Sequence, residues 1–123
     1  VDAEPCTSET TDHCRSRSTP VTTSRQAIRP DTALKMQNML RAVVQKGTGQ
    51  AAALGGKEGG KTGTTNEGRD LLFIGYEPFN HWVLGVWLGN DDNSPTTGSS
   101  ALAAGLWGDI IRVAKSGGRQ AKP

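Results

Sequence analysis

Little in this sequence points to a membrane-spanning or nucleic-acid-binding protein. No apolar run approaches the roughly 20 residues that cross a bilayer. The formal net charge is only +2 and no block of Lys or Arg is present, so the sequence offers no basic stripe for a nucleic-acid backbone. Neither an initiator Met nor a signal peptide begins the chain at Val1, which is expected of either a mature protein or a fragment.

Cysteine is also scarce, since only Cys6 and Cys14 occur, with His13 beside the second. A zinc site needs four ligands at characteristic spacings, and here a fourth ligand is missing and the spacing matches no zinc pattern. We therefore predict neither a metal nor another cofactor. Two interpretations of the cysteines stay open: a local disulfide in an oxidising compartment, and two unpaired thiols in a loose segment.

Composition divides the chain into three parts. Residues 1–24 are rich in Thr, Ser, Asp, Glu and Pro, with too few apolar residues to offset the entropy of ordering, and are predicted to be an irregular or disordered connection. Residues 25–116 hold the periodic apolar segments and are predicted to form the ordered part. Residues 117–123 begin with two glycines and are predicted to be a loose tail.

A helix is predicted over residues 31–46. Its apolar residues recur at helical spacing and form one face, which consists of Met36, Met39, Leu40, Val43 and Val44. We predict that this face, including both methionines, packs in the core. Pro30 suits the first turn of the helix, and Gly47 is expected to end it.

A second helix is predicted over residues 101–115. The same spacing recurs along its apolar face, which consists of Ala103, Leu106, Trp107, Ile110, Ile111 and Ala114. Ser99 or Ser100 is expected to cap its N-terminus. Gly105 and Gly108 each weaken the helix by about 1 kcal/mol relative to Ala, so their presence indicates close approach to a neighbouring element.

Three strands are predicted between the helices. Residues 70–77 and 82–89 are apolar, strand-like runs joined by a turn that contains Pro78 and Asn80, which is typical of a hairpin. Residues 59–66 form the third strand. The fold class is therefore α/β of the α+β type, an antiparallel sheet of three adjacent strands flanked by two helices. Three strands lack the full set of neighbours of a complete sheet, which suggests part of a larger domain.

Residues 55–62 fit the phosphate-binding pattern G-x-x-x-x-G-K-[ST] letter for letter. Such a loop needs a buried strand before it and a helix after it, because the helix N-terminus holds the phosphate. The segment before the pattern is short and follows a helix end, and the segment from Thr64 onward is β-branched, polar and interrupted by Gly68. We therefore predict no nucleotide binding.

The same lysine begins a second pattern, Lys61-Thr62-Gly63 followed by Thr64 and Thr65. Threonine favours extended structure, and Gly63 removes a side chain where another backbone approaches. A lysine on such a strand, with hydroxyls at the alternating positions 62 and 64, makes a site for a small carboxylate. Taken alone, the tripeptide favours the alternative of a polar edge strand with a solvated lysine.

The wider sequence changes this balance through four segments that occur in a fixed order. They are residues 41–49 (RAVVQKGTG), 60–66 (GKTGTTN), 69–78 (RDLLFIGYEP) and 83–92 (VLGVWLGNDD). Together they strongly resemble the second half of the transpeptidase domain of class A, bifunctional penicillin-binding proteins, over roughly residues 27–114. The chain departs from the family at Leu72, where an aromatic residue is frequent, and at Arg29, where a Ser or similar cap is frequent.

The resemblance implies that residues 25–116 are the C-terminal part of a fold shared with serine β-lactamases. The family also carries Ser-x-x-Lys and Ser-x-Asn motifs before the K-T-G strand. Neither motif occurs in this chain. The serine nucleophile is therefore expected upstream of Val1, and the chain by itself is expected to be inactive.

The activity implied by the resemblance is D,D-transpeptidation, in which an acyl-serine intermediate cross-links peptidoglycan stem peptides. Lys61 and Thr64 are the implied catalytic residues, and Thr62, Gly63, Thr64 and Thr65 are the implied substrate-binding residues. Implied partners are stem peptides and β-lactams. A glycosyltransferase domain and a membrane anchor are expected upstream, on the extracytoplasmic face of the bacterial cytoplasmic membrane. A serine β-lactamase, a D,D-carboxypeptidase or a non-catalytic peptidoglycan-binding relative are the alternatives.

Overall fold

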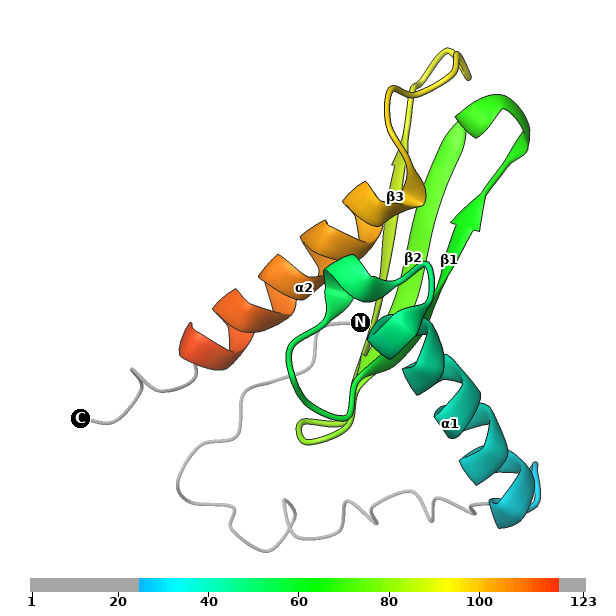
Figure 1. Cartoon of the computed structure of the whole chain (residues 1–123), viewed down its shortest axis with the longest axis vertical. Coiled ribbons are helices and arrows are strands. Elements are labelled where there is room, and N and C mark those ends of the chain that lie inside the picture. The colour runs from blue at the N-terminus through cyan, green and yellow to red at the C-terminus, as the bar shows by residue number, and fades with distance from the viewer. Residues whose placement is uncertain (1–24, 118–123) are drawn as a thin grey trace, which may run out of the picture.

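Two helices and three strands form the part of the chain that the structure, a computed structural model, describes, namely residues 25–117 (Figure 1). In chain order they are α1 (Pro30–Lys46), β1 (Gly59–Thr64), β2 (Asp70–Glu77), β3 (Trp82–Gly89) and α2 (Ser100–Gly117). Short 3₁₀ turns, η1 (Gln50–Ala52) and η2 (Asn66–Gly68), flank β1. The predicted order of helix, three strands and helix is confirmed.

The strands form one antiparallel sheet in the order β1-β2-β3. Leu71 and Phe73 on β2 are buried, whereas Ile74, on the opposite face, is 57% exposed. Because side chains alternate between the faces of a strand, the sheet has one covered and one open face. Both helices pack against the covered face, α1 mainly on β1 and α2 on β2 and β3.

Trp107 of α2 occupies the centre of the core. Its side chain is fully buried and meets the Phe73 ring edge to face at a centroid distance of 5.4 Å. Its indole N–H donates a hydrogen bond of 3.1 Å to the Leu84 carbonyl of β3. Gly75 leaves the space that the indole fills, since a Cβ there would lie 2.9 Å from Trp107 Cε2. A single side chain thus joins α2 to two strands.

The prediction that both methionines of α1 pack in the core is wrong in this chain. Met36 and Met39 are 51% and 58% exposed, and only Val44 of the predicted face is buried. The reason is the placement of α1, which meets the sheet at its C-terminal end while its first turns project away (Figure 1). Helical periodicity identifies the apolar face but not how much of its length has a partner.

The apolar face of α2 is also narrower than predicted. Leu106 and Ile110 remain more than 40% exposed, while small residues on the adjacent side of the helix are buried. Gly108 confirms the predicted close approach, since its Cα position lies so near η1 that a Cβ would sit 3.4 Å from the Ala51 carbonyl oxygen. Ser99 is the cap, and its hydroxyl accepts a 3.4 Å hydrogen bond from the Ala101 N–H.

Strand β1 ends two residues earlier than predicted. The chain turns at η2, where Glu67 and Gly68 both have positive φ angles of 60° and 67°. A left-handed residue cannot continue a strand, so β1 stops at Thr64. Lys61 lies in the middle of this strand rather than at the start of a helix, which is not the geometry of a phosphate-binding loop.

Several predicted features lie outside the described residues. They are Cys6, His13, Cys14, the irregular segment 1–24 and the tail beyond Gly117, which is itself the last residue of α2. Between residues 25 and 117, neither helix has the length and apolar character needed to cross a membrane.

Candidate functional site

The outer edge of β1 is the structural setting of the Lys61-Thr65 motif. In the described sheet, β1 pairs with β2 on one side only. The Thr65 N–H donates to the Asp70 carbonyl at 3.1 Å, so Thr65 directs its backbone groups toward β2. Backbone groups alternate along an antiparallel strand, and therefore Thr64 and Thr62 direct theirs toward the unpaired edge. The motif thus presents main-chain donors and acceptors that no described strand pairs with.

Lys61 extends over this edge. Its side chain is exposed, and its ammonium group donates to the Thr62 carbonyl at 2.9 Å and approaches Thr62 Oγ1 at 3.4 Å. The carbonyl bond agrees with the direction inferred from Thr65, because an exposed side chain reaches that oxygen from outside the sheet. Positive charge and backbone donors therefore lie side by side on one edge, which suits an anionic or carbonyl-bearing ligand.

The two threonines predicted to bind a carboxylate have different surroundings. Thr62 is buried, and its hydroxyl lies 2.6 Å from the hydroxyl of Thr48, in the loop after α1. Thr64 shares that face of the strand but is exposed. Thr48 is a residue that the sequence did not identify as part of the site. This hydrogen bond links the loop after α1 to the middle of β1.

Two glycines of β1 differ in what surrounds them. A Cβ at Gly60 would lie 2.5 Å from Phe73 Cζ and 2.7 Å from the Ile74 carbonyl oxygen, so packing within the chain excludes a side chain there. A Cβ at Gly63 would meet only Leu72, at 3.4 Å, which is ordinary contact. Nothing within the described residues requires glycine at position 63. The free space over Gly63 is therefore available to a ligand that lies along the strand.

Thr65 is engaged with the start of β2. Its hydroxyl donates to the Asp70 carboxylate at 2.8 Å and accepts from the Asp70 N–H at 2.9 Å. The other carboxylate oxygen of Asp70 accepts from the Trp87 indole N–H at 2.8 Å. Hydrogen bonds from Trp87 and Thr65 lower the pKa of Asp70 below its ordinary value, so the carboxylate is ionised at neutral pH.

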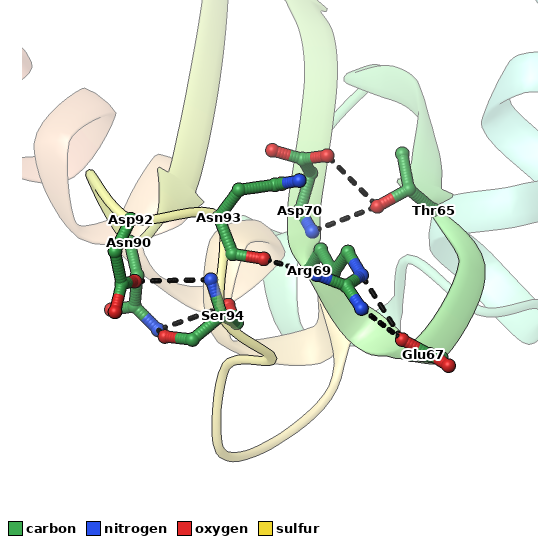
Figure 2. Close-up of polar contacts among 8 residues, drawn as sticks. All are labelled: Thr65, Glu67, Arg69, Asp70, Asn90, Asp92, Asn93 and Ser94. Carbon is green, nitrogen blue, oxygen red and sulfur yellow. Dashed lines mark hydrogen bonds and ion pairs between the residues drawn. The ribbon is translucent and has the colours of Figure 1, made fainter.

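A second polar cluster supports the turn that follows β1. Arg69 pairs with Glu67 and also donates to the Asn93 carbonyl, in the loop between β3 and α2 (Figure 2). In the same loop, the Ser94 N–H donates to Asp92 at 3.0 Å, and the Thr96 N–H donates to the Gly68 carbonyl at 3.0 Å. The end of β1 is therefore braced by a loop more than twenty residues away.

Glu58 stabilises the turn that precedes β1. The side chain is buried and its carboxylate accepts from the Leu54 N–H at 2.6 Å and from the Gly56 N–H at 3.0 Å. These bonds close the glycine-rich turn before β1 around a negative charge. The Leu54 and Gly56 N–H groups are thus already engaged by Glu58 and are not open to a phosphate.

The outer edge of β1 lines neither of two clefts found among the described residues. One cleft of about 480 Å³ lies between α1 and the β2–β3 turn and includes Arg41, Lys57 and Trp82. Another of about 500 Å³ lies beside the end of β3 and includes Trp87 and Asn90. Lys61 to Thr65 contribute to neither, so the motif forms an open edge rather than an enclosed pocket.

Comparisons with known proteins identify relatives of this chain. A family model described as the penicillin binding protein transpeptidase domain matches residues 4–112. Penicillin-binding protein 1A of Clostridium botulinum (strain Langeland) is 38% identical over 96 residues, which cover 76% of this chain and 11% of that protein. The corresponding protein of Neisseria cinerea is 39% identical over 101 residues, which cover 76% of this chain and 12% of that protein. The chain thus spans 11–12% of the length of these relatives.

Proposed function

Because this chain belongs to the penicillin-binding protein transpeptidase family, we propose that it supplies the substrate-binding edge of a peptidoglycan D,D-transpeptidase. The observation that carries the proposal is the edge of β1 that no described strand pairs with, where the backbone groups of Thr64 point outward and the Lys61 ammonium lies on the neighbouring Thr62 carbonyl. The space over Gly63 adds room for a peptide lying along the strand.

The proposed reaction proceeds in two acyl transfers. A serine hydroxyl, after losing its proton to a neighbouring base, attacks the carbonyl carbon of the D-Ala-D-Ala bond. The tetrahedral intermediate collapses, the C–N bond breaks, and the terminal D-Ala leaves with a proton on its nitrogen. An amine of a second stem peptide then attacks the acyl-serine ester. The new amide bond forms the cross-link, and the serine recovers its proton.

Four features of β1 contribute to this reaction. The Thr64 N–H is one donor to the developing oxyanion, and preorganised donors of this kind each contribute about 3–4 kcal/mol to lowering the barrier. Lys61 places a positive charge near the terminal carboxylate of the substrate. The exposed Thr64 hydroxyl bonds that carboxylate. Thr62 has an indirect role: it does not contact the substrate through its side chain, because its hydroxyl is hydrogen-bonded to Thr48.

The remaining parts of the enzyme belong to the same proposal. The reacting serine and its lysine lie upstream of this chain, since no Ser-x-x-Lys occurs in it. The full-length protein carries a membrane anchor and a glycosyltransferase domain, and its transpeptidase domain lies on the extracytoplasmic side of the cytoplasmic membrane. Its partners are stem peptides and the β-lactams that resemble them.

The proposal predicts covalent labelling of the full-length protein and none of the isolated chain. On incubation with a fluorescent penicillin, the full-length protein is expected to gain one acyl group on a serine outside residues 1–123. The chain alone is expected to gain none, because its own serines lack a lysine three residues on. Intact mass and peptide mapping measure both outcomes. A stoichiometric adduct on a serine of the isolated chain would show that a complete site lies within it.

Gly60 and Gly63 of β1 provide a matched pair of substitutions. In the full-length protein, Gly63→Ala is expected to slow acylation by roughly 10- to 100-fold with little change in melting temperature, because the methyl group meets the ligand and not the protein. Gly60→Ala is expected instead to lower the free energy of unfolding by about 1–3 kcal/mol, since its methyl group collides with Phe73 and a backbone carbonyl. Acylation rates and thermal unfolding of both variants distinguish the roles. The assignment of Gly63 fails if its variant acylates at the parental rate.

A further inference from the structure

Asp70, the first residue of β2, is hydrogen-bonded both to the residue that follows β1 and to a residue of β3. Three hydrogen bonds join it to Thr65, two of them through the Thr65 hydroxyl and one between the two backbones. A fourth joins its carboxylate to the Trp87 indole of β3. Side-chain alternation places Thr65, Asp70 and Trp87 on the open face of the sheet, the same face as Lys61 and Gly63. We call these three residues the Asp70 clamp.

The Asp70 clamp lies at the C-terminal end of β1, where the strand has few other contacts to hold it. Thr64 is the last residue of β1, and the left-handed turn at Glu67 and Gly68 follows within four residues. Terminal residues of an edge strand are the first to open, because they have few neighbours. Thr65 is fixed on Asp70 through both its N–H and its hydroxyl, so the peptide that joins Thr64 to Thr65 cannot rotate freely and the Thr64 backbone is held in its extended conformation.

The Thr64 N–H belongs to the preceding peptide, which joins Gly63 to Thr64, and its direction depends on the backbone conformation of Thr64. This direction matters because an oxyanion donor must point at the position where charge develops, and a misplacement of about 1 Å can cost about 10²-fold in rate. We propose that Asp70 is a positioning residue of the acyl-transfer site, which holds the Thr64 N–H on the open edge through its bonds to Thr65 and Trp87. This inference rests on the proposed function, and Asp70 itself touches no reacting atom.

The test uses four substitutions in the full-length protein: Asp70→Ala, Thr65→Val, both together, and Thr65→Ser. The concentration dependence of labelling by a fluorescent penicillin gives the noncovalent dissociation constant and the acylation rate constant separately. Only protein that becomes labelled contributes to the rate constant, so an unfolded fraction does not affect it. Asp109→Ala is the matched control, because Asp109 is an exposed acid of α2 that pairs with Arg112 of the same helix.

Asp70→Ala and Thr65→Val are each expected to lower the acylation rate constant by about 10- to 100-fold, less than the loss of an entire oxyanion donor. The dissociation constant is expected to change by less than about threefold, because the donor acts mainly in the transition state. The double variant is expected to be no slower than the slower single variant, since both remove one shared contact. Thr65→Ser, which keeps the hydroxyl, is expected to retain at least half of the parental rate, and Asp109→Ala is expected to leave the rate unchanged.

Two results would overturn the positioning role: a parental acylation rate constant in Asp70→Ala, or effects of the two single substitutions that multiply in the double variant. A loss confined to the dissociation constant would also overturn it. A full-length parental protein that takes up no penicillin refutes the proposed function itself, and this outcome is distinct because it needs no variant.

Discussion

In the full-length protein, Lys61→Ala is expected to slow acylation by penicillin by about 100-fold or more. The exposed ammonium lies on the unpaired edge of β1, where its charge is available to a carboxylate. A charged donor aimed at a ligand in a partly desolvated site has an effect comparable to that of an oxyanion donor, which is about 10²–10³ in rate. The melting temperature is expected to change by less than about 2 °C, because an exposed lysine contributes little to packing.

Lys57 provides the control for this prediction. It is exposed, carries the same charge and lies four residues earlier, in the turn before β1 and beside the cleft at α1. Lys57→Ala is expected to acylate within about twofold of the parental rate, because a charge outside the site contributes only a screened, long-range effect. Equal losses in the two variants would mean that net charge, and not the position of Lys61, controls the reaction. A parental rate in folded Lys61→Ala would remove this residue from the site.

The largest expected effect on stability comes from Trp107→Ala. The substitution empties the centre of the core and removes the indole that packs on Phe73 and bonds to the Leu84 carbonyl. Large-to-small changes of this kind cost about 3–5 kcal/mol, a large part of the total stability of a domain. The full-length variant is expected to lose penicillin labelling at a temperature at least about 5 °C lower than the parental protein.

Two further substitutions separate size from polarity in this effect. Trp107→Phe keeps most of the ring but lacks the N–H donor, and is expected to lose about 1–3 kcal/mol for the carbonyl left without its partner. Trp82→Ala removes an equally large side chain that is 37% exposed, and is expected to lose much less than Trp107→Ala. Similar unfolding temperatures for Trp82→Ala and Trp107→Ala would contradict the central role of Trp107.

Local patterns were sufficient to predict the elements of the fold. Alternating and helical apolar periods depend on neighbouring residues, and the three strands and two helices lie within a few residues of where the sequence placed them. The errors in the prediction concern which part of each element packs against another element. Met36 and Met39 have the right spacing for a buried face but extend past the end of the sheet, and their spacing contains no information about that.

The candidate site was predicted only as far as one continuous segment. Lys61 to Thr65 were identified as candidate residues because they are adjacent in the chain and resemble a family motif. Thr48, Glu58 and Asp70 were not found, because their contacts join separate elements or a turn whose shape the sequence does not specify. Thr48 lies fourteen residues before Thr62, and Trp87 lies seventeen residues after Asp70. Such pairs become visible only when the sheet register is known.

The unpaired edge of β1 has a consequence for self-association. A free strand edge that accepts a peptide also accepts the same edge of another copy, which is how many proteins begin to aggregate. Lys61 opposes this, because antiparallel pairing of two such edges about this position would bring two ammonium groups of like charge close together. Gly63 further weakens the tendency of the strand to add a partner. The residues proposed to bind a carboxylate-bearing peptide thus also oppose pairing of identical molecules, and a substitution that removes the Lys61 charge is expected to favour such pairing.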